Sequence, residues 1–339
     1  MVKEEIRLRK VILHILDSAS GQPVLSDREL ESGSELQDFI KEHIAKIFAG
    51  DDSKKCEFHK HESDVYALLN EYDDENFVEI SKELAKKLYD IMNANIDIPS
   101  ADLFVVRFSS DSLEYLAILK MNYKTMYTHR SVPGEDGLYN EVFRYKELLP
   151  QESQKLAEAC VIRLNDLSIS LVEKKAEING KKEDYFSELY LKCHARLSDK
   201  KKLAIVQKAI ESVNNSAYEE QSRYEPQMKA KAVINEQLTK NGGFVVEELG
   251  DLVFEGREDL RTAYQDKMEQ YNLVKEEVLP QSESTTRRYL KQCLVTDTGI
   301  EIKIPMEEYE KEGNIEFVTN PDGSTSLYIK NIGNISAKF

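Results

Sequence analysis

The run Leu103-Phe-Val-Val-Arg-Phe108, together with Leu113-Glu-Tyr-Leu-Ala-Ile-Leu-Lys-Met121 after it, decides the fold. The first run is apolar except for one arginine, which is typical of a strand buried on both faces. The intervening Ser109-Ser-Asp-Ser112 is a turn composition, so the two runs predict an antiparallel pair of strands. We expect this pair to form the middle of an N-terminal sheet.

The sequence before this pair predicts one more strand and three helices. Residues 5–16 alternate between apolar and polar positions, with a phase shift near Arg9–Lys10 that suggests a bulge. Ser34 and Gln37 form a capping box at the start of a helix that Gly50 ends. Further helices are expected over 63–71 and after Asp74, while the polar residues 51–60 predict a loop.

After the central pair, turn-forming residues alternate with strand patterns. Residues 128–137, with the sequence THRSVPGEDG, predict a loop because proline and glycine are concentrated there. Residues 160–164 and 167–172 predict another hairpin. The strands and helices of the chain are grouped and do not alternate regularly, which favours the α+β class.

The periodicity changes at about residue 175. Residues 198–278 carry apolar stripes at helical spacing, and the last fifty residues return to strand patterns around the turn Asn320-Pro-Asp-Gly323. We therefore expect an N-terminal antiparallel or mixed sheet with helices, a helical middle region and a small C-terminal β-meander. The corresponding domains are an α+β domain over 1–175, a mainly helical region over 176–290 and the meander over 291–339.

Charge is distributed unevenly along the chain. The 339 residues contain 46 Lys and Arg against 62 Asp and Glu, a formal net charge of −16, and the sequence pI is near 5.0. Domains that coat nucleic acid with their whole surface usually have a pI above about 9. The segment 181–208 nevertheless holds eight basic and four acidic residues. A local excess of this kind attracts a polyanion to one place only.

This basic segment is the strongest candidate binding site in the sequence. Lys200, Lys201 and Lys202 open a predicted helix, where cations oppose the macrodipole and each cost a few tenths of a kcal/mol. Their presence at an unfavourable position suggests a use, although lysine stems that merely cover apolar surface would explain them too. A smaller basic cluster follows near residue 290. The candidate DNA-contacting residues are Lys192, Arg196, Lys200, Lys201, Lys202, Arg287, Arg288 and Lys291.

Two other groups of residues are candidates for a metal site or a catalytic thiol. Cys56, His59 and His61 have ligand-type side chains, but zinc needs a fourth ligand or a water and the sequence offers no second ligand pair nearby. Cys193 and His194 are adjacent, and sequence neighbours rarely point together as a nucleophile and its base. The chain has no phosphate-binding glycine loop and no nucleophile-elbow motif. We therefore expect no catalytic residue, no metal and no cofactor.

The apolar runs of the chain are short. The N-terminal run Val11-Ile-Leu13 is followed by His14 and ended by Asp17, too short for a secretory signal or a membrane helix. The four cysteines are widely spaced, which favours free and mostly buried thiols. These features lead us to expect a cytoplasmic protein.

Four stretches together resemble the bacterial nucleoid-associated protein family called NdpA or YejK. Val11-Ile-Leu-His-Ile-Leu-Asp17 is similar to its N-terminal strand, with His14 at the position of the family histidine, and Leu113–Leu119 is similar to a central strand. Leu164-Asn-Asp-Leu-Ser-Ile169 resembles a turn and strand of the family, with Leu164 in place of isoleucine and Ser168 in place of aspartate. The C-terminal strands from Thr298 onwards resemble its meander.

The resemblance implies residence in the cytoplasm within the bacterial nucleoid, and no known enzymatic activity. On this basis we expect a non-enzymatic protein that touches the DNA backbone weakly and without reading sequence. An alternative is an acidic adaptor that binds nucleoid proteins and makes little direct contact with DNA. Its acidic runs 71–75 and 307–312 would then face a basic partner, although such runs are most simply solvated surface.

Overall fold

The computed structural model describes residues 1–135 and 137–336. The chain divides into two units, a first unit over Met1–Ser198 and a second unit over Asp199–Phe339. The first unit is a sheet with helices and the second is mainly helical, with short hairpins near its end. The predicted α+β class is therefore confirmed. The domains expected over 1–175, 176–290 and 291–339 stay a prediction, and residues 176–198 belong to the first unit of the structure.

A seven-stranded sheet forms the centre of the first unit, in the order β1-β3-β4-β7-β8-β2-β11, and every neighbouring pair is antiparallel. The predicted central pair becomes β3 and β4, and the pairing of β1 with β3 shifts register between Leu8 and Lys10, where a bulge was predicted. The strands are β1 (Arg7–Leu16), β2 (Lys54–Phe58), β3 (Ala101–Ser110), β4 (Leu113–Asn122), β7 (Glu158–Arg163), β8 (Ile169–Val172) and β11 (Cys193–Ala195).

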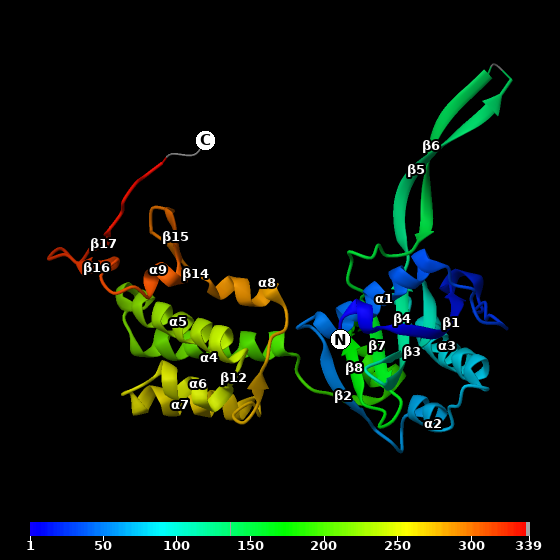
Figure 1. The fold of residues 1–339 in the computed structure, drawn as a ribbon, viewed down its shortest axis with the longest axis horizontal. Helices are drawn as coiled ribbons and strands as arrows, with labels where there is room; N and C mark the ends of the chain where they lie inside the picture. The colour runs from blue at the N-terminus through cyan, green and yellow to red at the C-terminus, as the bar shows by residue number, and fades with distance from the viewer. Residues whose placement is uncertain (136, 337–339) are drawn as a thin grey trace. The chain divides into compact units, whose positions relative to one another are not determined.

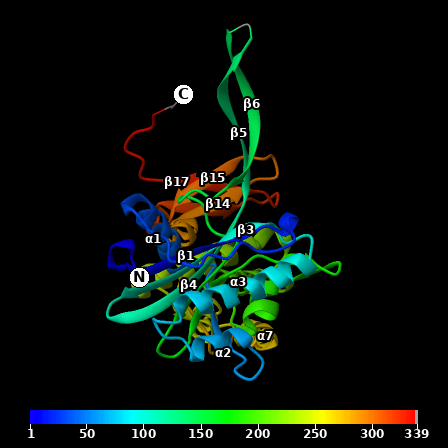
Figure 2. The ribbon, with the colours of Figure 1, turned by 90° about the vertical axis from the view of Figure 1, so that its right-hand side faces the viewer.

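Helices cover both faces of this sheet, which explains why β3 and β4 are apolar along nearly their whole length. On one face, α2 (Asp64–Asn70), α3 (Phe77–Ala94) and the π-helical turn Phe186–Leu191 pack against the sheet. On the other face, α1 (Ser34–Ala49) covers residues of β3, β4 and β7. Figure 2 shows α1 and α3 on opposite sides of the strands.

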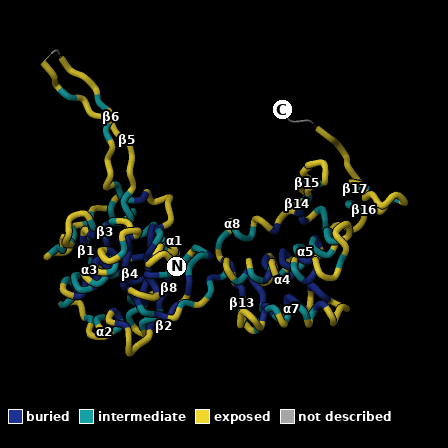
Figure 3. Tube along the Cα trace, turned by 180° about the vertical axis from the view of Figure 1, so that it is seen from behind, coloured by how far each residue is buried: buried dark blue, intermediate teal, exposed yellow. Residues whose placement is uncertain are grey.

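A long two-stranded ribbon leaves this sheet after β4. Its strands are β5 (Lys124–Gly134) and β6 (Gly137–Leu148), which pair only with each other among the described residues. Figure 1 shows the ribbon projecting away from the sheet, and Figure 3 shows it exposed along most of its length. We call this ribbon the arm. A second, much smaller hairpin of the unit consists of β9 (Ala176–Ile178) and β10 (Lys181–Glu183).

The second unit is built on two long helices, α4 (Asp199–Ala217) and α5 (Tyr224–Asn241). Two shorter helices, α6 (Val246–Val253) and α7 (Glu258–Gln270), contact them, and Gly242 ends α5 in the left-handed conformation. The remaining elements are β12 (Phe244–Val245), β13 (Glu277–Val278), α8 (Glu283–Thr286), β14 (Lys291–Val295), β15 (Glu301–Pro305), α9 (Met306–Tyr309), β16 (Ile315–Thr319) and β17 (Thr325–Ile329). The C-terminal strands form two separate hairpins, β14–β15 and β16–β17.

Three local predictions were wrong. Residues 51–60 contain β2, because Lys54, Cys56 and Phe58 alternate into the core. Residues 128–137 lie mostly within the arm, where the exposure of both faces removes the apolar alternation that marks a strand. Gly33, not Ser34, is the N-cap residue of α1, and no side-chain capping bond forms, because the Gln37 amide donates instead to the Ser32 carbonyl at 3.0 Å.

Candidate nucleic-acid interface

The strand order of the first unit brings distant basic residues to one place. Because β2 pairs with both β8 and β11, Lys55 of β2 lies near Arg163 at the end of β7 and Arg196, which follows β11. These three residues line a cleft of about 430 Å³, which Ser168 and Ser170 also line. We call it the basic cleft. It lies on the α1 side of the sheet, since Phe48 of α1 and Val161 of β7 border it.

Alternation along β2 explains why Lys55 faces this cleft. Lys54, Cys56 and Phe58 are buried, whereas Lys55 and Glu57 are exposed on the other face of the strand. The Arg196 amide donates a hydrogen bond to the Lys55 carbonyl at 2.9 Å, so the backbone extends the β2–β11 pairing by one residue. The side chains of Lys55 and Arg196 therefore project from rigid, paired backbone.

Each basic side chain of the cleft has one polar partner. Lys55 Nζ donates a hydrogen bond to Ser170 Oγ at 3.0 Å. Arg196 Nη2 lies 3.0 Å from Glu57 Oε1 in an exposed ion pair. Arg163 binds the Asp166 carboxylate through Nε and Nη2, and this contact holds the pKa of Asp166 at about 2. Three cations thus face two carboxylates, which leaves a local excess of one positive charge on an acidic chain.

The predicted residue Lys192 lies just before β11. Its backbone is left-handed, with φ 48°, and its carbonyl accepts a hydrogen bond from the His59 amide at 2.9 Å. Its side chain is half-buried. Lys192 and Arg196 are the only two of the eight predicted contact residues in the first unit, and the other six belong to the second.

In the second unit, Lys200, Lys201 and Lys202 occupy the first turn of α4, as the sequence predicted. Lys202 is mostly buried, and its ammonium binds Glu276 Oε2 at 2.7 Å and the Glu277 carbonyl at 3.0 Å. Lys200 and Lys201 are exposed. The carboxylate of Glu276, from outside the helix, therefore offsets the unfavourable interaction of the Lys202 charge with the helix dipole.

The second predicted basic cluster lies around the start of β14. Arg287, Arg288 and Lys291 are all exposed, and Arg287 pairs with Glu283 one helical turn earlier at 2.8 Å. Arg288 lines a pocket of about 320 Å³ between α4 and α5. Arg196, Lys202 and Arg287 each have a carboxylate partner of their own unit.

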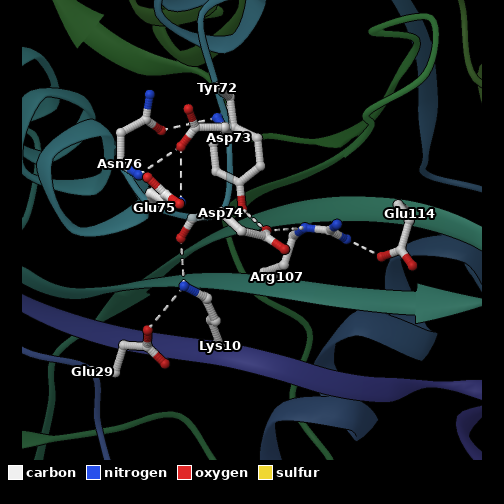
Figure 4. Close-up of polar contacts among 9 residues, drawn as sticks. All are labelled: Lys10, Glu29, Tyr72, Asp73, Asp74, Glu75, Asn76, Arg107 and Glu114. Carbon is white, nitrogen blue, oxygen red and sulfur yellow. Dashed lines mark hydrogen bonds and ion pairs between the residues drawn. The ribbon is translucent and has the colours of Figure 1, made fainter.

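The acidic run 71–75 is tied into the first unit. Asp73 Oδ1 accepts the backbone amides of Glu75 and Asn76 at 2.8 Å and so organises the start of α3. Asp74 Oδ1 lies 3.3 Å from Arg107 Nε, and its carbonyl accepts a hydrogen bond from Lys10 (Figure 4). These contacts show that Asp73 and Asp74 stabilise the first unit itself. Fewer carboxylates of the run are therefore available to bind a basic partner protein.

The structure separates the side chains of the candidate metal site and of the candidate catalytic thiol. Cys56 is buried in the core, whereas His59 and His61 are exposed. Cys193 and His194 lie on a strand, so their side chains point to opposite faces, and a hydrogen bond with Cys56 together with burial raises the pKa of the Cys193 thiol. Within residues 1–135 and 137–336, no group of three ligand-type side chains could hold a metal ion.

The sequence reasoning missed two of the three cations in the basic cleft. Lys55 fell in a predicted loop, and Arg163 lies at the end of a predicted strand with no basic neighbour nearby. The alternation of Cys56 and Phe58 was the one signal that could have revealed β2. The position of β2 between β8 and β11 had no local signal.

Comparisons with known proteins support the family reading. No helix in the described part of the chain has the length and apolarity to span a bilayer. Comparison with curated protein sequences gives no significant match. A family model described as "Nucleoid-associated protein YejK" matches residues 12–335, nearly the whole chain and both units. The chain therefore belongs to the YejK family of nucleoid-associated proteins.

Proposed function

We propose that this chain is a non-enzymatic protein of the bacterial cytoplasm that contacts the DNA backbone in the nucleoid without reading base sequence. The observation that carries the proposal is the basic cleft, where three separate strands or strand ends bring Lys55, Arg163 and Arg196 together. Lysine and arginine contacts to phosphate supply most sequence-independent DNA affinity. Family membership supports the setting in the nucleoid.

The chemistry of the cleft suits a phosphodiester. Arginine and lysine side chains donate charge-assisted hydrogen bonds to phosphate oxygens, and the hydroxyls of Ser168 and Ser170 line the same space. The two aromatic side chains that border it, Phe48 and Tyr115, contact each other at 6.3 Å between ring centres, and Tyr115 stacks on Phe108, so base stacking has little support. We therefore expect contacts that position the protein on the backbone.

The predicted residues of the second unit remain part of the proposal, with unequal weights. Lys200, Lys201, Arg288 and Lys291 are exposed, and the proposal assigns them backbone contacts in addition to those of the cleft. Lys202 and Arg287 have carboxylate partners that a phosphate would have to displace. Lys192 lies next to the cleft strand β11 and would add a flanking contact.

The test is fluorescence anisotropy with a labelled duplex of random sequence at low salt. The variant Lys55→Glu/Arg196→Glu should lower the affinity at least about tenfold, because two attractions become repulsions. The matched control is Lys86→Glu/Lys87→Glu, which makes the same change in charge on α3, on the opposite side of the sheet. It should change the affinity less than about twofold.

Two results would contradict this proposal. Equal losses in the cleft variant and in Lys86→Glu/Lys87→Glu would show that only net charge matters. An absence of binding by the pure wild-type chain, together with capture of a basic nucleoid protein, would favour the acidic adaptor.

A further inference from the structure

The arm carries apolar side chains on a ribbon that no other described strand pairs with. Six large apolar side chains on it are between 47% and 73% exposed: Met126, Tyr127, Leu138, Tyr139, Val142 and Tyr145. A two-stranded ribbon without a covering layer is marginally stable in water at best. Exposed apolar patches of this extent mark interaction sites. We propose that the arm is a self-association element that packs against the arm of a second copy of this chain.

The six side chains divide between the two faces of the arm. The register pairs Met126 with Tyr145 and Val132 with Tyr139 on one face. The charges in the middle of this face are already neutralised, because Arg130 pairs with Glu141, and the Arg130 guanidinium lies 5.1 Å from the Phe143 ring centre. Tyr127, Leu138 and Val142 project from the other face and are 71–73% exposed. This second, more exposed face is the one that packs against the second copy.

The exposed area fits a dimer contact. One arm can cover only one face of the other, so Tyr127, Leu138 and Val142 offer roughly 300 Å² of apolar area per copy. A standard interface buries about 800 Å² per partner. Two arms that lie along each other by this face therefore form a contact at the small end of interface sizes, which predicts a dimer in exchange with the monomer.

The charges along the arm favour a second copy in the antiparallel direction. Three cations, Lys124, Arg144 and Lys146, outnumber Glu147 near the base of the arm, whereas Glu135 follows β5 at the tip. An antiparallel contact therefore places the acidic tip of one arm beside the basic base of the other. Over the rest of their surface, two copies of the chain repel each other, because each carries a formal charge of −16.

Residues 124–148 contain four basic and four acidic residues, so the arm is the segment where two copies can approach without that repulsion. The same balance argues against DNA as the occupant. Backbone binding draws its affinity from an excess of cations, and an acidic tip repels phosphate. The inference is thus independent of the basic cleft.

Light scattering coupled to size exclusion, at tens of micromolar chain, is the experiment. The full chain should elute with twice the 39.0 kDa mass of one copy. Leu138→Glu/Val142→Glu alters only exposed side chains and should weaken the dimer at least about tenfold. The matched control is Ile96→Glu, which alters a 98% exposed side chain after α3 and should leave the dimer intact.

A charge-swap series tests the antiparallel direction. Lys146→Glu should weaken the dimer, and Glu135→Lys added to the same chain should restore it, since tip and base become complementary again. A wild-type chain that stays at 39.0 kDa would overturn the proposal, as would a dimer that the arm variants leave unchanged. Arm variants that lose DNA affinity at unchanged mass would overturn it in favour of a nucleic-acid arm.

Discussion

Arg196 Nη2 lies 3.0 Å from Glu57 Oε1, and both side chains line the basic cleft. Glu57 lies on β2 and Arg196 directly follows the adjacent strand β11, and solvent weakens the attraction in this exposed pair. A phosphate that enters the cleft therefore competes with Glu57 for the same guanidinium. The carboxylate limits the affinity of the cleft for any anion.

Removal of this competitor should tighten DNA binding. Glu57→Gln keeps the shape of the side chain and frees Arg196, so we expect an affinity roughly fivefold higher, the size of one exposed charge interaction. Anisotropy titrations at one fixed salt concentration measure the change. The matched control Glu83→Gln frees Lys86 on the other side of the sheet and should have no comparable effect. Weaker binding by Glu57→Gln would argue against the cleft.

Lys201 and Lys202 should behave differently although they are neighbours. Lys201→Gln removes an exposed charge and should lower DNA affinity with little change in stability. Lys202→Gln breaks the contacts with Glu276 and the Glu277 carbonyl, which should cost about 1–2 kcal/mol of unfolding free energy. Urea unfolding and anisotropy separate the two effects. The reverse assignment, with Lys202 dominating DNA affinity, would show that its pairing with Glu276 is not kept in solution.

His14 should make the first unit sensitive to acid. Burial holds the pKa of His14 at about 4, below its ordinary value of 6.5. As the pH falls below 6.5 the unfolded state takes up a proton that the folded state refuses, so stability is complete above pH 6.5 and is lost toward pH 4. The ring accepts a hydrogen bond from the Ser26 amide at 3.1 Å, and its other nitrogen lies 3.0 Å from Ser81 Oγ.

The variant His14→Gln retains a donor and an acceptor but does not titrate. The loss of unfolding free energy between pH 7.5 and pH 5 should therefore be smaller in His14→Gln than in the wild type. His43, whose pKa burial also lowers to about 4, remains in both proteins and supplies the residual drop. Identical drops in the two proteins would remove His14 as a cause.

Lys120 and Glu158 form a buried pair at the middle of the sheet. Lys120 is fully buried on β4, its Nζ lies 3.6 Å from Glu158 Oε2, and burial lowers the pKa of this lysine to about 8. Lys120→Met leaves the Glu158 carboxylate buried without its cation and should lower the free energy of unfolding by about 3–5 kcal/mol. Lys120→Met/Glu158→Leu should recover much of this loss, since neither charge is then buried. Urea unfolding of both proteins checks the pair, and an undiminished loss in the double variant would contradict it.

Local sequence patterns predicted the strands that are buried on both faces and the helices that bury one apolar stripe. The apolar runs at 103–108 and 113–121 appeared as β3 and β4, and the bulge near Lys10 appeared in β1. The helical stripe that begins at Leu203 appeared in α4. In these cases burial and period are properties of one segment, so one segment suffices to reveal them.

The arm and the basic cleft depend on information that no single segment contains. Pro133 and Gly134 favour a loop by their composition. The arm has no buried face, so its strands lack the apolar alternation that would have outweighed this signal. The cleft needed the pairing of Lys54 with Leu171 and of Cys193 with Phe58, contacts between residues more than a hundred positions apart. Only the sheet topology brings Lys55 beside Arg196.

The salt dependence of DNA binding tests the central claim most directly. Each phosphate contact of a duplex contributes about −0.9 to the slope of log affinity against log salt. Lys55→Gln/Arg196→Gln should therefore make the slope shallower than that of the wild type by about 2. Equal slopes for the two proteins would contradict the claim that the basic cleft meets the DNA backbone.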